Sequence, residues 1–144
     1  MTEQHKKIAD ALTRAQHAAQ TGDLKAAAHW AKIAAKQSPR DPLPCLLLGD
    51  MELASACFQS ATKHYREALR RKPDLVAGHG NLGVAWLRQG EFQKAEQCFE
   101  RVLRLHPHDV CALLNLGYAA QSQGRDEIAL GYYRQVIAID PGFL

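Results

Sequence analysis

The 144-residue sequence has no long hydrophobic run. No stretch approaches the roughly 20 apolar residues that a membrane-spanning helix needs. The polar segment from Met1 to Lys7 also lacks the apolar core of a secretory signal peptide. We therefore expect a cytoplasmic protein that has no membrane partner.

The sequence also has little excess charge of one sign. Its 18 basic and 15 acidic residues give a formal net charge of +3. The single basic cluster, Arg70-Arg71-Lys72, stands directly before Pro73. Proline marks the end of a helix, where the backbone dipole favours cations. We therefore interpret the cluster as a helix end and expect no nucleic-acid partner.

Motifs for catalysis and metal binding are missing as well. The four cysteines form no Cys-x-x-Cys pair, and no pair of histidines completes a zinc-like spacing. His106 and His108 flank a proline in a segment that we interpret as a turn. There is no glycine-rich phosphate loop and no nucleophile motif. We expect no metal, no cofactor and no catalytic activity, so the chain is predicted not to be an enzyme.

What the sequence does have is a period of 34 residues, and such periods are typical of repeat architectures. Prolines, glycines and alanines each follow it with their own phase: Pro39, Pro73, Pro107 and Pro141; Gly49, Gly83 and Gly117; Gly90 and Gly124; Ala27, Ala61, Ala95 and Ala129. The period predicts one domain over residues 1–144, made of four repeats at about 8–41, 42–75, 76–109 and 110–143.

Each repeat is expected to contain two helices. In the third repeat, apolar residues recur at helical spacing over 76–89 and again over 91–105, with Gly90 between the two segments. Small residues let two helices approach closely, and a large aromatic side chain then fills the remaining gap. We expect such pairs between Gly83 and Trp86 and between Ala95 and Phe99.

The repeats resemble a known pattern. The third reads His79-x-x-Leu82-Gly83-x-x-Trp86, followed by an alanine, an aromatic residue and a proline at fixed spacings. This resembles the tetratricopeptide repeat (TPR), and the second and fourth repeats resemble it too. The first repeat is degenerate, since Arg14 and Ala15 replace Leu-Gly. The resemblance implies an all-α, right-handed α-solenoid of four helix-turn-helix repeats with about eight helices.

The resemblance further implies a function in protein–protein interaction. In TPR proteins the first helix of each repeat lines a concave groove that binds a peptide or a helix of a partner protein. The residues that we expect to line such a groove are Leu43, Leu46, Leu47, Asp50, Asn81, Val84, Arg88, Asn115, Tyr118 and Ser122.

Two parts of this set carry distinct expectations. Asn81 and Asn115 each precede Leu-Gly. This is similar to the asparagine ladder of O-linked N-acetylglucosamine transferases and to a pattern common among bacterial TPR proteins, and an amide could pair with a ligand's main chain. The alternative is that they are solvated on an exposed face. Because successive helical residues differ by about 100°, Leu46, Leu47 and Leu48 cannot all pack inward. We expect Leu47, or both Leu46 and Leu47, to face the groove unless the first repeat covers them.

The sequence argues against one TPR activity. Binders of acidic chaperone tails resemble each other in a carboxylate clamp of Lys, Asn and Arg on three consecutive first helices. The two alignments of that clamp on this chain place no Lys or Arg at its positions, which are Leu12, Gln16, Leu47, Ala77 and Asn81, or Leu46, Asp50, Asn81, Cys111 and Asn115. We therefore predict no chaperone-tail carboxylate clamp.

Two other hypotheses stay open. The chain could be the TPR arm of a larger enzyme, such as a glycosyltransferase, or part of a longer scaffold. It could also form a homo-oligomer through an uncapped C-terminal helix. That helix has more apolar residues than one buried stripe accounts for, namely Tyr132, Tyr133, Val136, Ile137 and Ile139.

Overall fold

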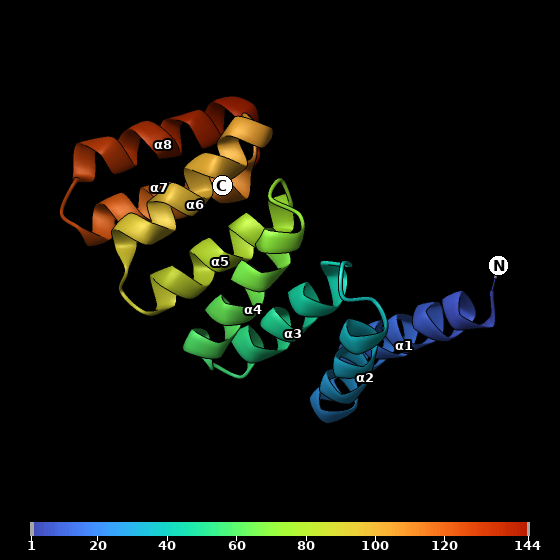
Figure 1. The fold of residues 1–144 in the computed structure, drawn as a ribbon. Coiled ribbons are helices and arrows are strands. Elements are labelled where there is room, and N and C mark those ends of the chain that lie inside the picture. The colour runs from blue at the N-terminus through green and yellow to red at the C-terminus, as the bar shows by residue number, and fades with distance from the viewer. Residues whose placement is uncertain (1, 144) are drawn as a thin grey trace. The chain divides into compact units, whose positions relative to one another are not determined.

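The computed structural model describes residues 2–143, and the side chains of all of these except Gln4, Ile8 and Ala9. The expected domain end points, Met1 and Leu144, lie outside the described residues. The described chain forms eight α-helices and no strand (Figure 1), which are α1 Glu3–Gln20, α2 Leu24–Gln37, α3 Leu43–Ala54, α4 Phe58–Arg71, α5 Val76–Arg88, α6 Phe92–Leu105, α7 Val110–Ser122 and α8 Asp126–Ile139. The all-α architecture expected from the sequence is confirmed.

The described chain divides into two compact units, one ending at Gly78 and the other starting at His79. In the first unit, α1 packs against α2 and α3 packs against α4. In the second unit, α7 packs against α6 on one side and α8 on the other. The division of the chain into a single domain with the four repeat boundaries given above stays a prediction.

Several helices begin where an acidic side chain accepts hydrogen bonds from the first turn. Asp23 accepts a bond of 3.0 Å from the backbone N–H of Ala26 at the start of α2. Asp109 does the same for Ala112 at the start of α7, at 2.8 Å. Such caps satisfy N–H groups that have no partner inside the helix. The caps at Asp23 and Asp109 therefore fix where α2 begins in the first unit and where α7 begins in the second.

The tight turn inside each repeat needs a left-handed backbone conformation. Three of these turns use glycine, with φ of +82° at Gly22, +74° at Gly90 and +73° at Gly124. The second repeat has Ala56 at the equivalent place, and its φ is +59°. Because a Cβ atom clashes with the following carbonyl in this region, Ala56 stores strain that the three glycines avoid.

Close packing between the two helices of a repeat depends on a glycine that faces an aromatic ring. A Cβ atom built on Gly83 in α5 would lie 2.7 Å from Cζ of Phe99 in α6. Gly49 has the same relation to Tyr65, and Gly117 has it to Tyr133. The expected pairing of Gly83 with Trp86 was therefore wrong, because Gly83 faces across the hairpin. Trp86 is half-buried on the same helix and lies under the ammonium of Lys94, 4.5 Å from the ring centroid.

The expected pairing of Ala95 with Phe99 was wrong for the same reason. Both residues lie on α6 and both are buried, but Phe99 fills the space opposite Gly83. Residues four apart on one helix share a face, so both point toward α5 without closing a gap between two helices. The aromatic ring is matched to the glycine on the facing helix.

The first repeat solves the same packing problem with alanine. Ala15 and Ala31 occupy the places that glycine and an aromatic residue hold in the other repeats, and both are fully buried in one apolar cluster. The cluster also contains Leu48 and Met51 from α3. The Arg14 guanidinium lies over the Trp30 ring, 4.6 Å from its centroid. The first repeat therefore departs from the pattern in sequence but retains a close helix–helix contact.

We predict that Gly83→Ala destabilises the chain. The new methyl group meets the buried Phe99 ring, and overpacking of this kind costs about 1–3 kcal/mol, against about 1 kcal/mol gained in helix propensity. The net loss in the free energy of unfolding is expected to be about 0–2 kcal/mol, measured by urea denaturation followed by circular dichroism.

The matched control is Gly80→Ala on the same helix. A Cβ built there has Val102 as its nearest neighbour, at 3.9 Å, which is an ordinary contact. This variant should gain up to about 1 kcal/mol from helix propensity alone. Equal gains for Gly83→Ala and Gly80→Ala would contradict the role assigned to the ring.

We also predict that Ala56→Gly stabilises the chain by about 0.5–1 kcal/mol, since relief of left-handed strain exceeds the added entropy of the unfolded state. Gly90→Ala is the reverse experiment at the equivalent turn, where nothing lies within 4 Å of a built Cβ. Its loss of stability should mirror the gain from Ala56→Gly. Thermal melts in which Ala56→Gly unfolds at a lower temperature than the natural chain would show that the turn is not strained.

Candidate functional site

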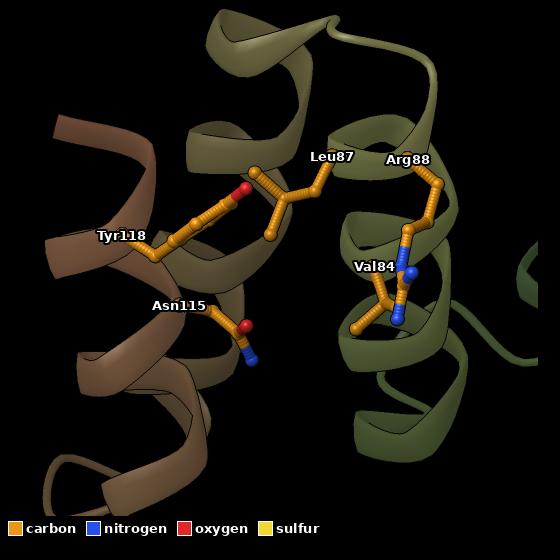
Figure 2. Close-up of a pocket in the computed structure, with 5 residues that line it drawn as sticks. All are labelled: Val84, Leu87, Arg88, Asn115 and Tyr118. Carbon is orange, nitrogen blue, oxygen red and sulfur yellow. The ribbon is translucent and has the colours of Figure 1, made fainter. Parts of the chain in front are cut away.

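The second unit contains a hollow of about 310 Å³ between α5 and α7. Val84, Leu87 and Arg88 line it from α5, and Asn115 and Tyr118 line it from α7. Figure 2 shows Tyr118 reaching from its helix toward Leu87, and Asn115 pointing into the space between the helices. The hollow therefore combines two aliphatic side chains, one aromatic ring, one amide and one guanidinium.

Helical spacing explains why these residues share a surface. Asn115 and Tyr118 are three residues apart on α7, and Val84 and Arg88 are four apart on α5. Residues at these spacings lie on the same helix face. Gly83 and Gly117, each next in sequence to a residue of the hollow, contact the second helix of their own repeats. Packing inside the hairpins thus fixes how these two helices are turned toward the hollow.

The polar groups of the hollow are accessible. Tyr118 is 55% exposed, although it is a large aromatic residue. The Asn115 side chain donates one hydrogen bond of 2.9 Å to the carbonyl of Cys111. An amide has two donor hydrogens and one acceptor oxygen, so this bond leaves one donor and the acceptor for a ligand. The arrangement could hold an extended main chain against an apolar wall.

The structure brings together four of the residues predicted from sequence, namely Val84, Arg88, Asn115 and Tyr118. Ser122 is exposed at the end of α7 and Asn81 is half-buried on α5, and neither lines the hollow. Leu87 lines it although it was not among the residues expected to line the groove. Its position, three residues after Val84, is the signal that could have identified it.

The four predicted residues of the first unit all lie on α3 and differ in their surroundings. Leu43 is 40% exposed, and Leu46 is half-buried. Leu47 is half-buried and packs against the apolar cluster of the first unit, which contains residues of α1, α2 and α3. Whether Leu47 faces a groove or is covered by the first repeat stays a prediction.

Asp50 has a structural contact that the sequence pattern did not indicate. Its carboxylate accepts a hydrogen bond of 2.7 Å from the buried hydroxyl of Tyr65. Burial raises the pKa of the Tyr65 phenol, and the adjacent Asp50 carboxylate raises it further. The hydroxyl therefore stays protonated and donates to Asp50, which ties the middle of α3 to α4.

Burial raises the pKa of the Cys45 thiol, so the less reactive thiol form is favoured. No three His, Cys, Asp or Glu side chains gather as metal ligands within the described part of the chain. None of the described helices is both long and apolar enough to cross a membrane.

The basic cluster at the end of α4 is used inside the chain. Arg70 and Arg71 both pair with Glu67, at 2.7 and 3.2 Å. Arg71 also donates a 3.0 Å hydrogen bond to the carbonyl of Asp41. The bond from Arg70 lowers the pKa of the Glu67 carboxyl. The interpretation of this cluster as a helix end is consistent with these contacts.

Helix α8 exposes large apolar side chains on two faces, since Leu130 and Ile137 share one face and Ile128 and Ile139 share another. Leu130 and Ile137 are 47% and 43% exposed, and Ile128 and Ile139 are exposed as well. Leu130 and Tyr133 also line a hollow of about 330 Å³ that extends to Gln121 on α7. Of the apolar residues noted from sequence on this helix, Val136 is buried, Tyr132 and Tyr133 are half-buried, and Ile137 and Ile139 are exposed. Part of this helix is thus uncovered by the described chain.

Comparison with known families identifies the repeat. Two family models, both described as tetratricopeptide repeat, match residues 45–108 and residues 87–142. The chain belongs to the tetratricopeptide repeat family. This TPR chain has no significant match among curated protein sequences.

Solved structures share the TPR fold over almost the whole chain. MamA residues 41 to the end, from Desulfovibrio magneticus RS-1, has a TM-score of 0.88 and 21% identity, covering 94% of this chain and 76% of that one. PilF from Pseudomonas aeruginosa has a TM-score of 0.85 and 16% identity, covering 97% and 64%. The Cut9–Hcn1 hetero-tetramer of the APC/C has a TM-score of 0.84 and 19% identity, covering 93% and 27%. At these identities the likeness concerns the fold alone, and it confirms the TPR architecture expected from sequence.

Proposed function

We propose that this TPR chain is a non-catalytic protein-interaction module that binds a peptide segment of a partner protein in the hollow between α5 and α7. The observation that carries this proposal is the convergence of Val84, Leu87, Arg88, Asn115 and Tyr118 on one exposed hollow. The glycine–ring packing inside the hairpins uses Gly83 and Gly117 and none of these five residues. Repeat proteins that bind other chains typically do so through surface residues that are not needed for packing between the repeats.

The chemistry of the hollow favours an extended peptide. Val84 and Leu87 offer an aliphatic wall for one apolar side chain, and the exposed Tyr118 ring can cover that side chain from α7. The Asn115 amide can pair with a ligand's main chain irrespective of the ligand's sequence. Arg88 supplies one cation, whereas a carboxylate clamp uses several on consecutive helices, so the proposed ligand is not an acidic chaperone tail.

The fold neighbours support an interaction role. The Cut9 structure is described as a hetero-tetramer with Hcn1, so that neighbour assembles with another protein. A fold supports many functions, and the choice of partner depends on the residues of each site. The proposal for this chain therefore rests on the hollow and uses the neighbours only as support. We likewise propose a cytoplasmic location and protein partners rather than nucleic acid.

The apolar face of α8 favours a second candidate function, which is self-association through this helix. Leu69 on α4 is the repeat equivalent of Ile137, and its Cδ2 atom lies 2.9 Å from a Cβ built on Gly78 in α5. In the first unit this position is therefore covered by the helix that follows. On α8 the corresponding Ile137 is exposed together with Leu130, which suits it to receive a helix from another copy of the chain.

We predict that Asn115→Ala/Tyr118→Ala weakens peptide binding. The probes are peptides selected from a displayed random library on the natural chain, with affinities measured by fluorescence anisotropy. Loss of the ring and the amide should raise Kd at least about tenfold, because aromatic anchors carry much of the binding energy at such surfaces. Both residues are accessible, so the melting temperature should not change.

The matched control is Gln97→Ala/Gln135→Ala, which alters two exposed residues on α6 and α8 that do not line the hollow. Binding to this variant should equal that of the natural chain. Selected peptides that bind both double variants with the natural affinity would show that the hollow is not the site. A library that yields no binder would count equally against the proposal.

For self-association, we predict that the average mass rises above the 16.0 kDa of one chain as concentration increases in sedimentation equilibrium. Leu130→Glu/Ile137→Glu should keep the protein monomeric, because buried unpaired carboxylates oppose the contact. Ala138→Glu, an exposed position on the same helix, is the control for added charge. A natural chain that stays monomeric at high concentration would exclude this second function.

A further inference from the structure

In the second unit, a polar bridge closes one end of the contact between α6 and α7. The Glu96 carboxylate on α6 accepts a 2.9 Å hydrogen bond from the Gln123 amide and pairs with the Arg125 guanidinium. The Gln123 amide also donates to the carbonyl of Ala119, which fixes its position. The Glu96 side chain is largely shielded from solvent. The side chains of Glu96, Gln123 and Arg125 therefore fill the space at this end of the α6–α7 contact.

The repeat period locates the equivalent place in the first unit, between α2 and α3. The residues that stand 68 positions before the bridge are Ala28, Ser55 and Cys57. Alanine has no polar group, and the two others are too short to cross the gap. The Cys57 thiol makes only a 3.7 Å contact with the carbonyl of Ser55. The loss of the bridge leaves a hollow of about 280 Å³, which we call the α2–α3 slot.

The floor of the α2–α3 slot is apolar. Leu48 and Met51 on α3 lie beneath it and are otherwise buried, and Leu24 stands exposed at its edge. Its volume lies near the lower end of the roughly 300–1,000 Å³ of small-molecule pockets. The slot therefore suits a single bulky side chain better than a whole small molecule.

The rim of the slot is basic. Lys25 and Lys32 line it from α2, and they share a helix face because they are seven residues, or about two turns, apart. No ion pair is recorded for either lysine among the described residues. Glu52 on α3 is the only acidic residue of the lining, so the mouth has an excess of one positive charge. Helix α2 itself contains three lysines and no acidic residue.

We propose that the α2–α3 slot binds a peptide segment of a partner protein that presents one bulky apolar side chain next to carboxylates. The apolar floor accommodates the side chain, and Lys25 and Lys32 attract the carboxylates. In the second unit the equivalent place is filled by side chains of the chain itself, whereas in the first unit it is open. The slot shares no residue with the hollow between α5 and α7, so it is a separate docking site.

The test restores the bridge. The triple variant Ala28→Glu/Ser55→Gln/Cys57→Arg introduces the residues that close the α6–α7 contact. A second variant, Ala28→Leu, fills the slot with the side chain that Leu130 has at the same repeat position and serves if the triple variant fails to fold. The probe is a displayed library of random peptides, selected on the natural chain and depleted on a slot-filling variant.

The enriched peptides should share a large aliphatic or aromatic residue flanked by Asp or Glu. Their Kd should rise at least about tenfold on the slot-filling variant and on Lys25→Gln/Lys32→Gln. It should not change on Lys36→Gln, an exposed lysine of α2 outside the slot, or on Asn115→Ala/Tyr118→Ala. The last comparison separates this site from the hollow of the second unit.

Three results would overturn the proposal. The first is a selection in which every peptide that binds the natural chain also binds the slot-filling variant, so that depletion leaves no peptides with an acidic, apolar motif. The second is equal affinity of the enriched peptides for the natural chain and the slot-filling variant. The third is a loss of affinity on Lys36→Gln as large as that on Lys25→Gln/Lys32→Gln, since this would indicate attraction to the whole helix.

Discussion

The structure depends on the contact between a glycine on one helix and an aromatic ring on the next. At Gly49, Gly83 and Gly117, the ring of the facing residue occupies the volume where a Cβ atom would be. This contact sets how closely the two helices of a repeat approach, and it fixes their rotation about their own axes. Once that rotation is fixed, residues such as Asn115 and Tyr118 must lie on the other side of the helix. The candidate site is thus a geometric result of how the core packs.

Much of the fold could be predicted from sequence because a period of 34 residues involves several residue types at once. Helix boundaries and turns followed from proline, glycine and helical spacing, since these reflect local backbone chemistry. The expected pairing of Gly83 with Trp86 was wrong, because the sequence pattern does not tell whether the aromatic partner of a glycine lies on the same helix or on the facing helix of the hairpin. Only the relative rotation of two helices distinguishes Trp86 from Phe99, and no local pattern encodes it.

The candidate sites were predicted less completely, for a related reason. Asp50 stands at the repeat position of Val84 and Tyr118, which line the hollow, but the Tyr65 hydroxyl on α4 donates a hydrogen bond to it. Leu87 could not be separated from the packed residues of its helix until its neighbour on α7 was known. The α2–α3 slot was not predicted at all, since it arises from one residue on α2 and two in the turn after α3, each unremarkable alone. Such features become visible only when equivalent positions of two repeats are compared in space.

The slot also shows how a repeat chain can acquire a new contact surface by deletion. Three short side chains at 28, 55 and 57 remove a self-contact and leave the helices themselves in place. The backbone that surrounds the slot is the one that every repeat already needs, so recognition can evolve there independently of folding. At each interface between neighbouring repeats, the residues at three positions decide whether a slot is present or filled. Substitutions at these positions could therefore introduce docking sites into a TPR array one interface at a time.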